Sequence, residues 1–329
     1  MPPRAGRPPS SRCSAWSRCS TRPPPILGVV GPTASGKTEL VLALARHWPV
    51  EVVVADSRQV YRGMDVGTAK PNAAARQAVP HHLIDLVDPD EPWSVAQWVE
   101  RARALLPEIA ARGRMPMLVG GTGLYVAALL DGHDYASQPW SPEVRRRLAD
   151  ELDAEGVVRL AERLRALDPT GAARIDLDNP RRVLRALERL EAGGGGVAPS
   201  GDPFAGRVAL LGISRPREVL YRRIDERARW LFEHGLLDEV RRLKDAGVRT
   251  DVRPMTGHGY GEAARHLAGE WKLEQAIEVT ARRTRQYAKR QLTWFRRDPR
   301  ILWLSAGARP ADDPALVAEA NRLLGAALA

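Results

Sequence analysis

A glycine-rich segment with a lysine and a threonine has the spacing of a phosphate-binding loop. Its eight residues are Gly31, Pro32, Thr33, Ala34, Ser35, Gly36, Lys37 and Thr38. They fit the pattern G-x-x-x-x-G-K-[ST] and lie between an apolar run and a helical pattern, the context that this motif requires. Backbone N–H groups and the positive end of the helix dipole would face the phosphate. Lys37 would add a positive charge and Thr38 a hydroxyl ligand for Mg²⁺. The segment predicts phosphate binding without indicating which compound is bound.

Two further polar side chains follow predicted strands. Asp56 comes after the apolar residues 52–55, and Thr122 comes after residues 117–121. Ligands of open α/β sheets lie at the carboxyl ends of the strands, so both side chains should reach the phosphate site. Asp56 could be a general base, a magnesium ligand or a helix N-cap, and its spacing alone favours the last two. Thr122 could contact the ligand or cap a helix.

A predicted helix near the C-terminus has one strongly basic side. Its stretch Arg282–Arg297 has no acidic residue and seven basic ones: Arg282, Arg283, Arg285, Lys289, Arg290, Arg296 and Arg297. Apolar residues gather on an adjacent face: Ile277, Ala281, Ala288, Leu292 and Phe295. Solvated helix faces usually alternate in charge, so we expect this row to contact nucleic-acid phosphates, with Arg285 and Lys289 among the contacts. A merely solvated face is the alternative.

Short apolar runs alternate with helical patterns, which predicts a parallel sheet flanked by helices. The expected strands are Ile26–Val30, Glu51–Val54, Met117–Val119, Val208–Ile213 and Ile301–Leu304, with His82–Leu86 as a weaker one. The fold class is therefore α/β, a P-loop-containing sheet with a helical insertion domain and a helical C-terminal part. We expect residues 26–132 and 205–329 to form the catalytic core and residues 133–204 to form the insertion. His81 and His82 are expected to be structural.

The amino-acid composition restricts the classes of protein to which this chain can belong. The 329 residues are 44% hydrophobic, which is ordinary for a globular protein, and no apolar run reaches the roughly 20 residues that a membrane-spanning helix needs. Residues 1–25 are rich in proline, serine and arginine, and we expect them to be disordered. Their five arginines supply half of the net charge of +10. Both cysteines lie there as well, which is consistent with a reducing cytoplasm.

At this point the chain resembles a known family, the tRNA dimethylallyltransferases. The matching segments are GPTASGKT at 31–38, DSRQVYRGMDVGTAKP at 56–71, HHLIDLVDP at 81–89, LVGGTGLY at 118–125, DNPRRVLRALE at 178–188, RIDERARWLFEHGLLDEVRRL at 223–243 and TRQYAKRQLTWFRRD at 284–298. They occur in the family's order between about residues 26 and 304, a series that a generic P-loop kinase would not share. The chain departs from the family at residues 255–261, where Gly259 and Tyr260 are kept but their neighbours differ.

The resemblance implies transfer of a dimethylallyl group from dimethylallyl diphosphate to the exocyclic N6 amine of the adenosine on the 3′ side of the anticodon in tRNA, with Mg²⁺ as cofactor. The P-loop would then hold an allylic diphosphate. By motif, Asp56 would be the general base, Thr122 would contact the diphosphate and Arg227 would clamp it. The anticodon stem-loop would be met by Asp56, Ser57, Arg58, Gln59, Arg145, Arg181, Arg182, Arg185, Gly259 and Tyr260.

Three other functions remain as alternatives. An adenylate isopentenyltransferase acting on free nucleotide would need neither the helical insertion nor the basic helix. A P-loop kinase of small molecules would consume ATP and leave the segments around Thr122 and Arg227 unexplained. A non-catalytic RNA-binding protein would leave the phosphate loop unexplained. We expect a cytoplasmic, monomeric protein that does not associate with membranes.

Overall fold

The computed structural model describes residues 23–132, 141–193 and 202–329. The expected disorder of residues 1–25 lies almost entirely outside this part of the chain, as do both cysteines and most of the glycine run at 193–196. The described chain divides into two compact units. The core unit comprises residues up to Ser94, Trp98–Val126 and Ala205–Ala329, and the helical unit comprises Val95–Gln97 and Ala127–Phe204.

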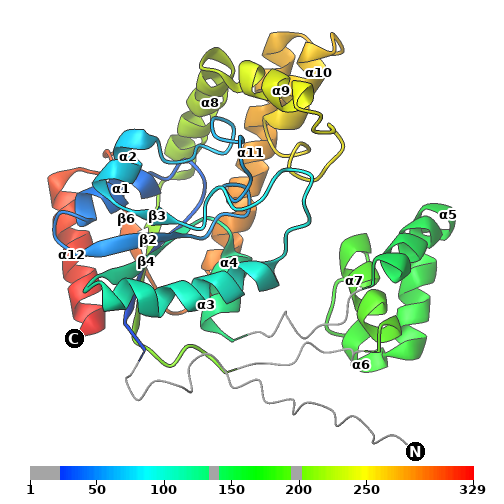
Figure 1. Ribbon diagram of the computed structural model, residues 1–329, viewed down its shortest axis with the longest axis horizontal. Helices are drawn as coiled ribbons and strands as arrows, with labels where there is room; N and C mark the ends of the chain where they lie inside the picture. Colours follow the sequence, from blue (N-terminus) through cyan, green and yellow to red (C-terminus); the bar gives the residue numbers. More distant parts are fainter. Residues whose placement is uncertain (1–22, 133–140, 194–201) are drawn as a thin grey trace, which may run out of the picture. The chain divides into compact units, whose positions relative to one another are not determined.

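A sheet of parallel strands forms the centre of the core unit (Figure 1). Its strands are β1 (Ile26–Val30), β2 (Val50–Val54), β3 (His81–His82), β4 (Met115–Gly120), β5 (Val208–Ser214) and β6 (Ile301–Ser305). Their spatial order is β3-β2-β4-β1-β5-β6, and all the pairings are parallel. The predicted α/β fold is thus confirmed, and the five stronger strand predictions each hold to within two residues.

The weaker strand prediction, His82–Leu86, was wrong. Only His81 and His82 pair with β2, and the chain then leaves the sheet. Leu83 and Asp85 have positive φ angles of 63° and 55°, which an extended strand does not allow. Both histidines are structural as expected: His81 Nδ1 lies 2.7 Å from the Val79 carbonyl and His82 Nε2 lies 2.7 Å from Glu51 Oε2.

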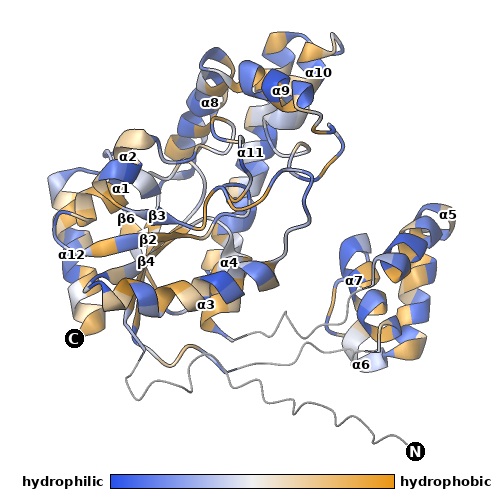
Figure 2. Cartoon of the chain, viewed as in Figure 1, coloured by the Kyte–Doolittle hydropathy of each residue, from blue (hydrophilic) through white to orange (hydrophobic). Residues whose placement is uncertain are grey.

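Helices cover both faces of the sheet. Those of the core unit are α1 (Lys37–Leu44), α2 (Ala73–Ala78), α3 (Val95–Ala111), α4 (Gly123–Leu130), α8 (Arg217–Glu233), α9 (Leu236–Asp245), α10 (Tyr260–Leu267), α11 (Leu273–Phe295) and α12 (Pro314–Leu328), of which α3 and α4 also lend a few residues to the helical unit. Helices α1 and α12 pack on one face and α3 runs along the other (Figure 1). The strands between them are largely hydrophobic (Figure 2), as expected for strands buried on both faces.

The chain order of the strands creates a switch point beside β1. From β1 the chain passes outward to β2 and β3, returns as β4 next to β1, and then adds β5 and β6 on the other side. Val30 at the end of β1 is in register with Gly120 of β4 and Gly212 of β5. The loops that follow β1 and β4 therefore leave the sheet side by side, which is where open α/β sheets bind ligands.

The helical unit has a small core of its own. It contains α5 (Pro142–Leu167), α6 (Pro169–Ala172) and α7 (Pro180–Glu191). Gly156, with φ 77° and ψ 169°, divides α5 into two helical segments. The buried residues are Leu148, Leu160, Ala161, Leu164, Ala172, Val183, Ala186 and Leu187. The helical insertion predicted from the sequence is thus helical in the structure, with α5 and α7 packed together.

Candidate active site

The loop after β1 adopts a backbone that only certain residues tolerate. Gly31 has φ 145° and Gly36 has φ 99°, and a Cβ on Gly36 would lie 2.5 Å from the Cβ of Ala311. Gly36 is the N-cap of α1, so the first residues of that helix, Lys37 and Thr38, directly follow the loop. This is the strand–loop–helix arrangement in which a phosphate meets backbone N–H groups and a helix N-terminus.

Three side chains from distant parts of the sequence hold the loop in place. Arg215 Nε donates to the Ser35 carbonyl at 2.8 Å, and Arg223 Nε donates to the Ala34 carbonyl at 2.9 Å. Gln291 Oε1 accepts a 2.9 Å hydrogen bond from the Thr33 N–H. The same Gln291 donates from Nε2 to the Gly121 carbonyl at 2.8 Å and so joins the loops that follow β1 and β4.

Lys37 folds back over the loop. Its Nζ donates to the carbonyls of Gly31 at 3.1 Å and Pro32 at 2.8 Å. Burial lowers the pKa of Lys37 from 10.5 to about 8, an effect that the negative charge of Asp56 partly offsets and the positive charge of Arg227 reinforces. Lys37, Asp56 and Arg227 therefore share one electrostatic site at the carboxyl edge of the sheet.

Arg227, on α8, is the second cation of this site. Burial lowers its pKa, and the charges of Glu39 and Asp56 oppose that shift. Within the described part of the chain, no carboxylate lies at ion-pairing distance from its guanidinium. An arginine keeps its charge in a protein, so a partly buried guanidinium without a carboxylate partner among the described residues is suited to an anionic ligand.

Asp56 lies just beyond β2, between cations and aromatic residues. Its Oδ1 accepts the backbone N–H of Arg58 at 2.9 Å, which fixes the turn after the strand. No helix begins there, so Asp56 caps a turn rather than a helix. Burial raises the pKa of Tyr287 to about 12, and the negative charge of Asp56 contributes to that rise. Burial and the same charge also raise the pKa of Tyr125.

Thr122 links the loops after β2 and β4. Its Oγ1 accepts the Ser57 N–H at 3.0 Å and its own N–H donates to the Ala55 carbonyl at 3.1 Å. A Cβ at position 120 would lie 2.0 Å from that same carbonyl oxygen, so only glycine fits beside it. Tyr287 forms a side-chain hydrogen bond with Thr122. The hydroxyl thus sits among site residues. Thr122 also stands at the start of α4, where its carbonyl accepts the N–H groups of Tyr125 at 2.9 Å and Val126 at 3.4 Å, so it caps that helix through its backbone.

Arg58 and Gln59 point into neighbouring loops. Arg58 Nη1 donates to the carbonyls of Arg253 at 2.7 Å and Pro254 at 3.3 Å. Gln59 Nε2 donates to the carbonyls of Thr68 and Ala69 at 3.2 and 3.3 Å. Both side chains therefore hold the turn that carries Asp56 against two other loops.

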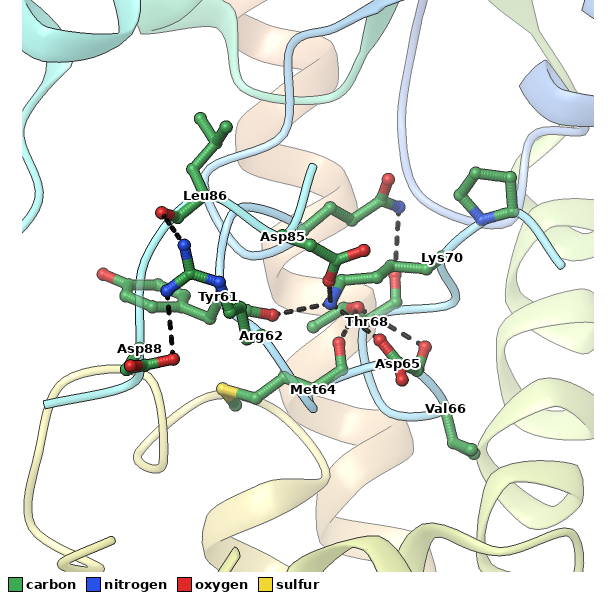
Figure 3. Close-up of polar contacts among 12 residues, drawn as sticks. Tyr61, Arg62, Met64, Asp65, Val66, Thr68, Lys70, Asp85, Leu86 and Asp88 are labelled. Carbon is green, nitrogen blue, oxygen red and sulfur yellow. Dashed lines mark hydrogen bonds and ion pairs between the residues drawn. The ribbon is translucent and has the colours of Figure 1, made fainter. Parts of the chain in front are cut away.

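The loop after this turn is organised around a buried lysine (Figure 3). Lys70 has 1% of its side chain exposed, and its Nζ donates to the Tyr61 carbonyl at 2.6 Å. It also pairs with Asp65 at 2.7 Å and Asp85 at 2.5 Å. Arg62 extends this network to the Leu86 carbonyl at 2.7 Å. The segment around His82–Leu86 thus serves as a support for the loop rather than as a strand.

Gly259 and Tyr260 lie where α10 begins. Gly259 has φ 94°, and its N–H donates to Glu262 Oε2 at 2.8 Å. The Tyr260 side chain is only 2% exposed, and its hydroxyl donates to Glu239. We expected Tyr260 to contact tRNA, but the structure places its phenol inside the protein, because the hydroxyl has an internal carboxylate partner. Its role here is to support a neighbouring loop.

The basic face of α11 is only partly available. The apolar stripe is buried as predicted, but Arg283 pairs with Glu262 and Arg285 pairs with Asp225. Lys289, Arg290 and Arg297 have no carboxylate partner among the described residues. The predicted row of free cations is therefore shorter than the sequence suggested, and Arg285 is a member of an ion pair.

The predicted arginines of the helical unit fall into two groups. Arg145, Arg181 and Arg182 are exposed, and within the described residues none of them pairs with a carboxylate. Arg185 pairs with Glu188 at 3.0 Å. The two glutamates Glu151 and Glu191 instead bind Arg147 and Arg163, which ties α5 to α7.

Sequence reasoning missed two residues of this site. Tyr287 contacts Thr122, and its ring lies 5.3 Å from that of His258. Gln291 joins two loops and is buried. A signal for Gln291 existed, because it lies three residues after Ala288 and four before Phe295, inside the apolar stripe of α11. A polar side chain in such a stripe needs a buried partner.

Comparisons with known proteins agree with this geometry. A family model described as IPP transferase matches residues 59–298, and one described as isopentenyl transferase matches residues 25–85. The tRNA dimethylallyltransferase of Syntrophobacter fumaroxidans is 45% identical over 305 residues, which cover 91% of this chain and 87% of that protein. The tRNA dimethylallyltransferase of Roseiflexus castenholzii is 45% identical over 302 residues, which cover 91% of this chain and 97% of that protein.

Solved structures give the same result. The full-length tRNA isopentenylpyrophosphate transferase of Bacillus halodurans is 40% identical with a TM-score of 0.69, covering 92% of this chain and 96% of that one. A eukaryotic dimethylallyltransferase acting on tRNA is 26% identical with a TM-score of 0.74, covering 91% of this chain and 78% of that one. With a family model matched over most of its length and relatives this similar, the chain belongs to the tRNA dimethylallyltransferase family.

Proposed function

We propose that this protein transfers a dimethylallyl group from dimethylallyl diphosphate to the N6 amine of the adenosine on the 3′ side of the anticodon in tRNA. The observation that carries the proposal is the joint electrostatic site of Asp56, Lys37 and Arg227. A carboxylate beside two cations suits a reaction in which a neutral amine loses a proton while a diphosphate departs with negative charge. Family membership and relatives named as tRNA dimethylallyltransferases support the same reaction.

The chemistry assigns each of these residues a role. The N6 nitrogen attacks the allylic carbon, the C–O bond to the diphosphate breaks, and the leaving diphosphate keeps the bonding electrons. The adenine amine is a weak nucleophile because its lone pair is delocalised into the ring. Asp56 takes the proton from N6 as the C–N bond forms. Lys37, Arg227 and the loop amides stabilise the charge that develops on the diphosphate, and Thr122 binds one of its oxygens.

The residues present fit a magnesium ion held jointly with the substrate. Thr38 is exposed in the first turn of α1, next to the phosphate loop. Among the described residues, no group of three or more His, Cys, Asp or Glu side chains could hold a metal by itself. Mg²⁺ commonly binds through substrate phosphates, waters and one or two protein oxygens. Thr38 would hold the ion, which when bound would neutralise part of the diphosphate charge.

The tRNA would reach this site with its target base turned out of the anticodon loop, because a stacked base does not expose N6 to Asp56. We propose that Arg145, Arg181 and Arg182 of the helical unit contribute phosphate contacts, since all three are exposed without a carboxylate partner among the described residues. None of the described helices has the length and apolar character needed to cross a bilayer. We propose a monomeric, cytoplasmic enzyme, with the absence of cysteine after residue 19 as support for the compartment.

The test uses dimethylallyl diphosphate labelled in its allyl group, incubated with the protein and Mg²⁺ and with either tRNA or AMP. We expect the tRNA to become labelled, and a tRNA with guanosine in place of the target adenosine to stay unlabelled. Labelled AMP would instead identify an adenylate isopentenyltransferase. ATP turnover without any transfer of the allyl label would identify a kinase, and binding of tRNA without transfer would contradict an enzymatic role.

A further inference from the structure

Arg215, the residue that follows β5, is a buried cation next to the phosphate loop. It is 8% exposed, and burial together with the nearby charge of Arg223 lowers its pKa. Arg223 has the carboxylate of Glu39 at 3.9 Å, whereas no carboxylate among the described residues lies at ion-pairing distance from Arg215. A buried charge without a carboxylate is costly, so hydrogen bonds or a bound anion must compensate it.

The guanidinium of Arg215 joins the phosphate loop to the turn that follows β6. Its Nε donates to the carbonyl of Ser35 at 2.8 Å. Its Nη1 donates to the carbonyls of Gly307 at 3.0 Å and Arg309 at 2.8 Å. One side chain therefore fixes the backbone of the loop after β1 to the backbone of a turn near the C-terminus.

The same turn, at residues 306–311, also lies against the N-cap of α1. A Cβ on Gly36 would lie 2.5 Å from the Cβ of Ala311 and 3.2 Å from Nη2 of Arg215. The turn is in turn anchored to the sheet, because the N–H of Ala306 donates to the carbonyl of Ser214 at 3.0 Å. The glycine at which the phosphate loop becomes a helix is thus packed against both the turn and the guanidinium.

The charge of Arg215 is not cancelled by its hydrogen bonds. Carbonyl oxygens satisfy Nε and Nη1, but they are neutral, and the buried Nη2 has no hydrogen-bond partner among the described residues. The hydroxyl of Ser35, a residue with no exposed surface, is also unpartnered within that part of the chain. A charge in such buried surroundings is weakly screened, so it acts on an anion held by the neighbouring loop.

We propose that Arg215 is a positioning residue of the donor site. Together with the turn at residues 306–311, it holds the phosphate loop in the conformation that binds diphosphate, and its positive charge adds to the attraction for that anion. It acts through Ser35 and Gly36 rather than by contact with the diphosphate. Donors and charges that are fixed before the ligand arrives need no reorganisation when it binds. The inference rests on the proposed function, because it takes an allylic diphosphate as the ligand of the loop.

The first experiment measures the Kd of inorganic diphosphate and of dimethylallyl diphosphate, each with Mg²⁺, for full-length wild type and three variants. Arg215→Gln can still donate hydrogen bonds but has no charge, so both Kd values should rise roughly 10- to 100-fold, the range for losing an interaction with a charged group. Arg215→Lys keeps the charge without the planar fork and should lose about 5-fold or less. Arg249→Gln, which removes an exposed cation paired with Asp251, should bind like wild type.

A second pair of variants tests the turn. Ala311→Val adds two carbon atoms beside Gly36 and should raise the Kd of both anions by roughly 5-fold or more, because the loop has to shift. Ala320→Val adds the same atoms at another buried position of the same core cluster, away from Gly36. It should lower stability in urea to a similar extent and leave both Kd values unchanged. The Kd for tRNA should stay at the wild-type value in every variant, since the loop holds the donor.

Three results would overturn the inference: Arg215→Gln binding diphosphate like Arg249→Gln, Arg215→Lys losing as much affinity as Arg215→Gln, or Ala311→Val binding like Ala320→Val. If Arg215→Gln does not fold, the two alanine variants decide. Inorganic diphosphate needs no acceptor, so these titrations are independent of transfer. Normal labelling of tRNA by wild type with unaffected variants would leave the proposed function standing and remove the role of Arg215. Affected variants without any labelling by wild type would contradict the proposed function instead.

Discussion

The hydroxyl of Tyr260 donates a 2.5 Å hydrogen bond to Oε1 of Glu239, a residue with no exposed surface. The same carboxylate accepts the backbone N–H groups of Asp65 at 2.9 Å, Val66 at 2.7 Å and Gly67 at 3.1 Å. Burial and the nearby charge of Glu239 raise the pKa of Tyr260 well above 10, so the phenol remains a donor. The start of α10 is thereby joined to the loop that follows the Asp56 turn.

The first prediction follows from this pair. Tyr260→Phe removes one donor from a buried carboxylate and should lower the free energy of unfolding by about 1–3 kcal/mol, measured by urea denaturation. The Kd for tRNA should change by less than a factor of about 3, because the phenol faces the protein interior. Arg249→Ala, which removes an exposed ion pair with Asp251, serves as a control and should leave stability nearly unchanged. Unchanged stability of Tyr260→Phe with a large loss of tRNA affinity would restore the direct-contact interpretation.

The second prediction concerns the charge of Lys37. Its free-state pKa of about 8 means that the ammonium loses its proton as the pH rises through 8, and only the charged form attracts diphosphate. Bound diphosphate raises this pKa, so binding near pH 8 should take up a proton and the Kd should increase above that pH. Calorimetry in two buffers of different ionisation enthalpy measures the uptake. Lys37→Arg keeps its charge throughout and should show no comparable uptake; equal uptake by both proteins would contradict the assignment.

A third prediction concerns the basic face of α11. The cations Lys289 and Arg290 have no carboxylate partner among the described residues, whereas Arg285 is paired with Asp225. Replacing Lys289 and Arg290 with alanine should reduce the slope of log K against log salt for tRNA by about one to two units. Arg285→Ala should change the slope much less, because its charge is already neutralised. Equal effects of the two variants would mean that the ion pair opens when RNA binds.

The fourth prediction uses His258. Burial and the cations Arg283, Arg58 and Arg290 lower its pKa from 6.5 to about 4, so the folded protein holds it neutral where the unfolded chain would protonate it. The contribution of the neutral His258 to the free energy of unfolding is therefore complete above pH 6.5. It is lost as the pH falls from 6.5 toward 4. In His258→Gln this part of the acid-induced loss should disappear from the pH dependence of the unfolding free energy. An identical pH dependence in the variant would show that His258 titrates normally.

Part of this molecule was predictable because its signals are local. The eight-residue phosphate loop and five of the strands follow from spacing and apolar runs, which depend on neighbours in the chain. The strand predicted at His82–Leu86 does not form, because Leu83 and Asp85 have positive φ angles. Those angles accompany a distant contact, since Asp85 pairs with Lys70. Periodicity contains no information on such a pair.

In the candidate active site, too, features with local sequence signals were predicted and features that depend on distant contacts were not. Lys37, Asp56 and Thr122 were found because each follows a strand, and strand ends meet at one sheet edge. The burial of Tyr260 depends on Glu239, and the ion pair of Arg285 depends on Asp225, 60 residues earlier in the chain. Tyr287 enters the site only because α11 packs so that one of its faces lies toward Thr122. Such partners are set by tertiary packing, which a single sequence does not display.

The last prediction concerns Asp56, for which three roles were considered. As general base it acts on a substrate held mainly by Lys37, Arg227 and the loop amides. Asp56→Ala should therefore lower the rate of transfer by roughly 10²- to 10⁴-fold with little effect on diphosphate affinity. As a magnesium ligand, Asp56 would instead set the diphosphate affinity and the Mg²⁺ requirement. As a turn residue bonded to the Arg58 N–H, it would contribute about 1 kcal/mol of stability and little to the rate.

Asp56→Asn separates the turn from the chemistry. The amide oxygen can still accept the Arg58 N–H, so the turn should persist, but an amide cannot take the proton from N6. We expect Asp56→Asn to be as stable as wild type and nearly as slow as Asp56→Ala. The measurement is single-turnover transfer with both substrates saturating, alongside titration of dimethylallyl diphosphate alone and urea denaturation. Transfer by Asp56→Asn at close to the wild-type rate would remove the general-base role, because an amide in place of the carboxylate cannot take the proton.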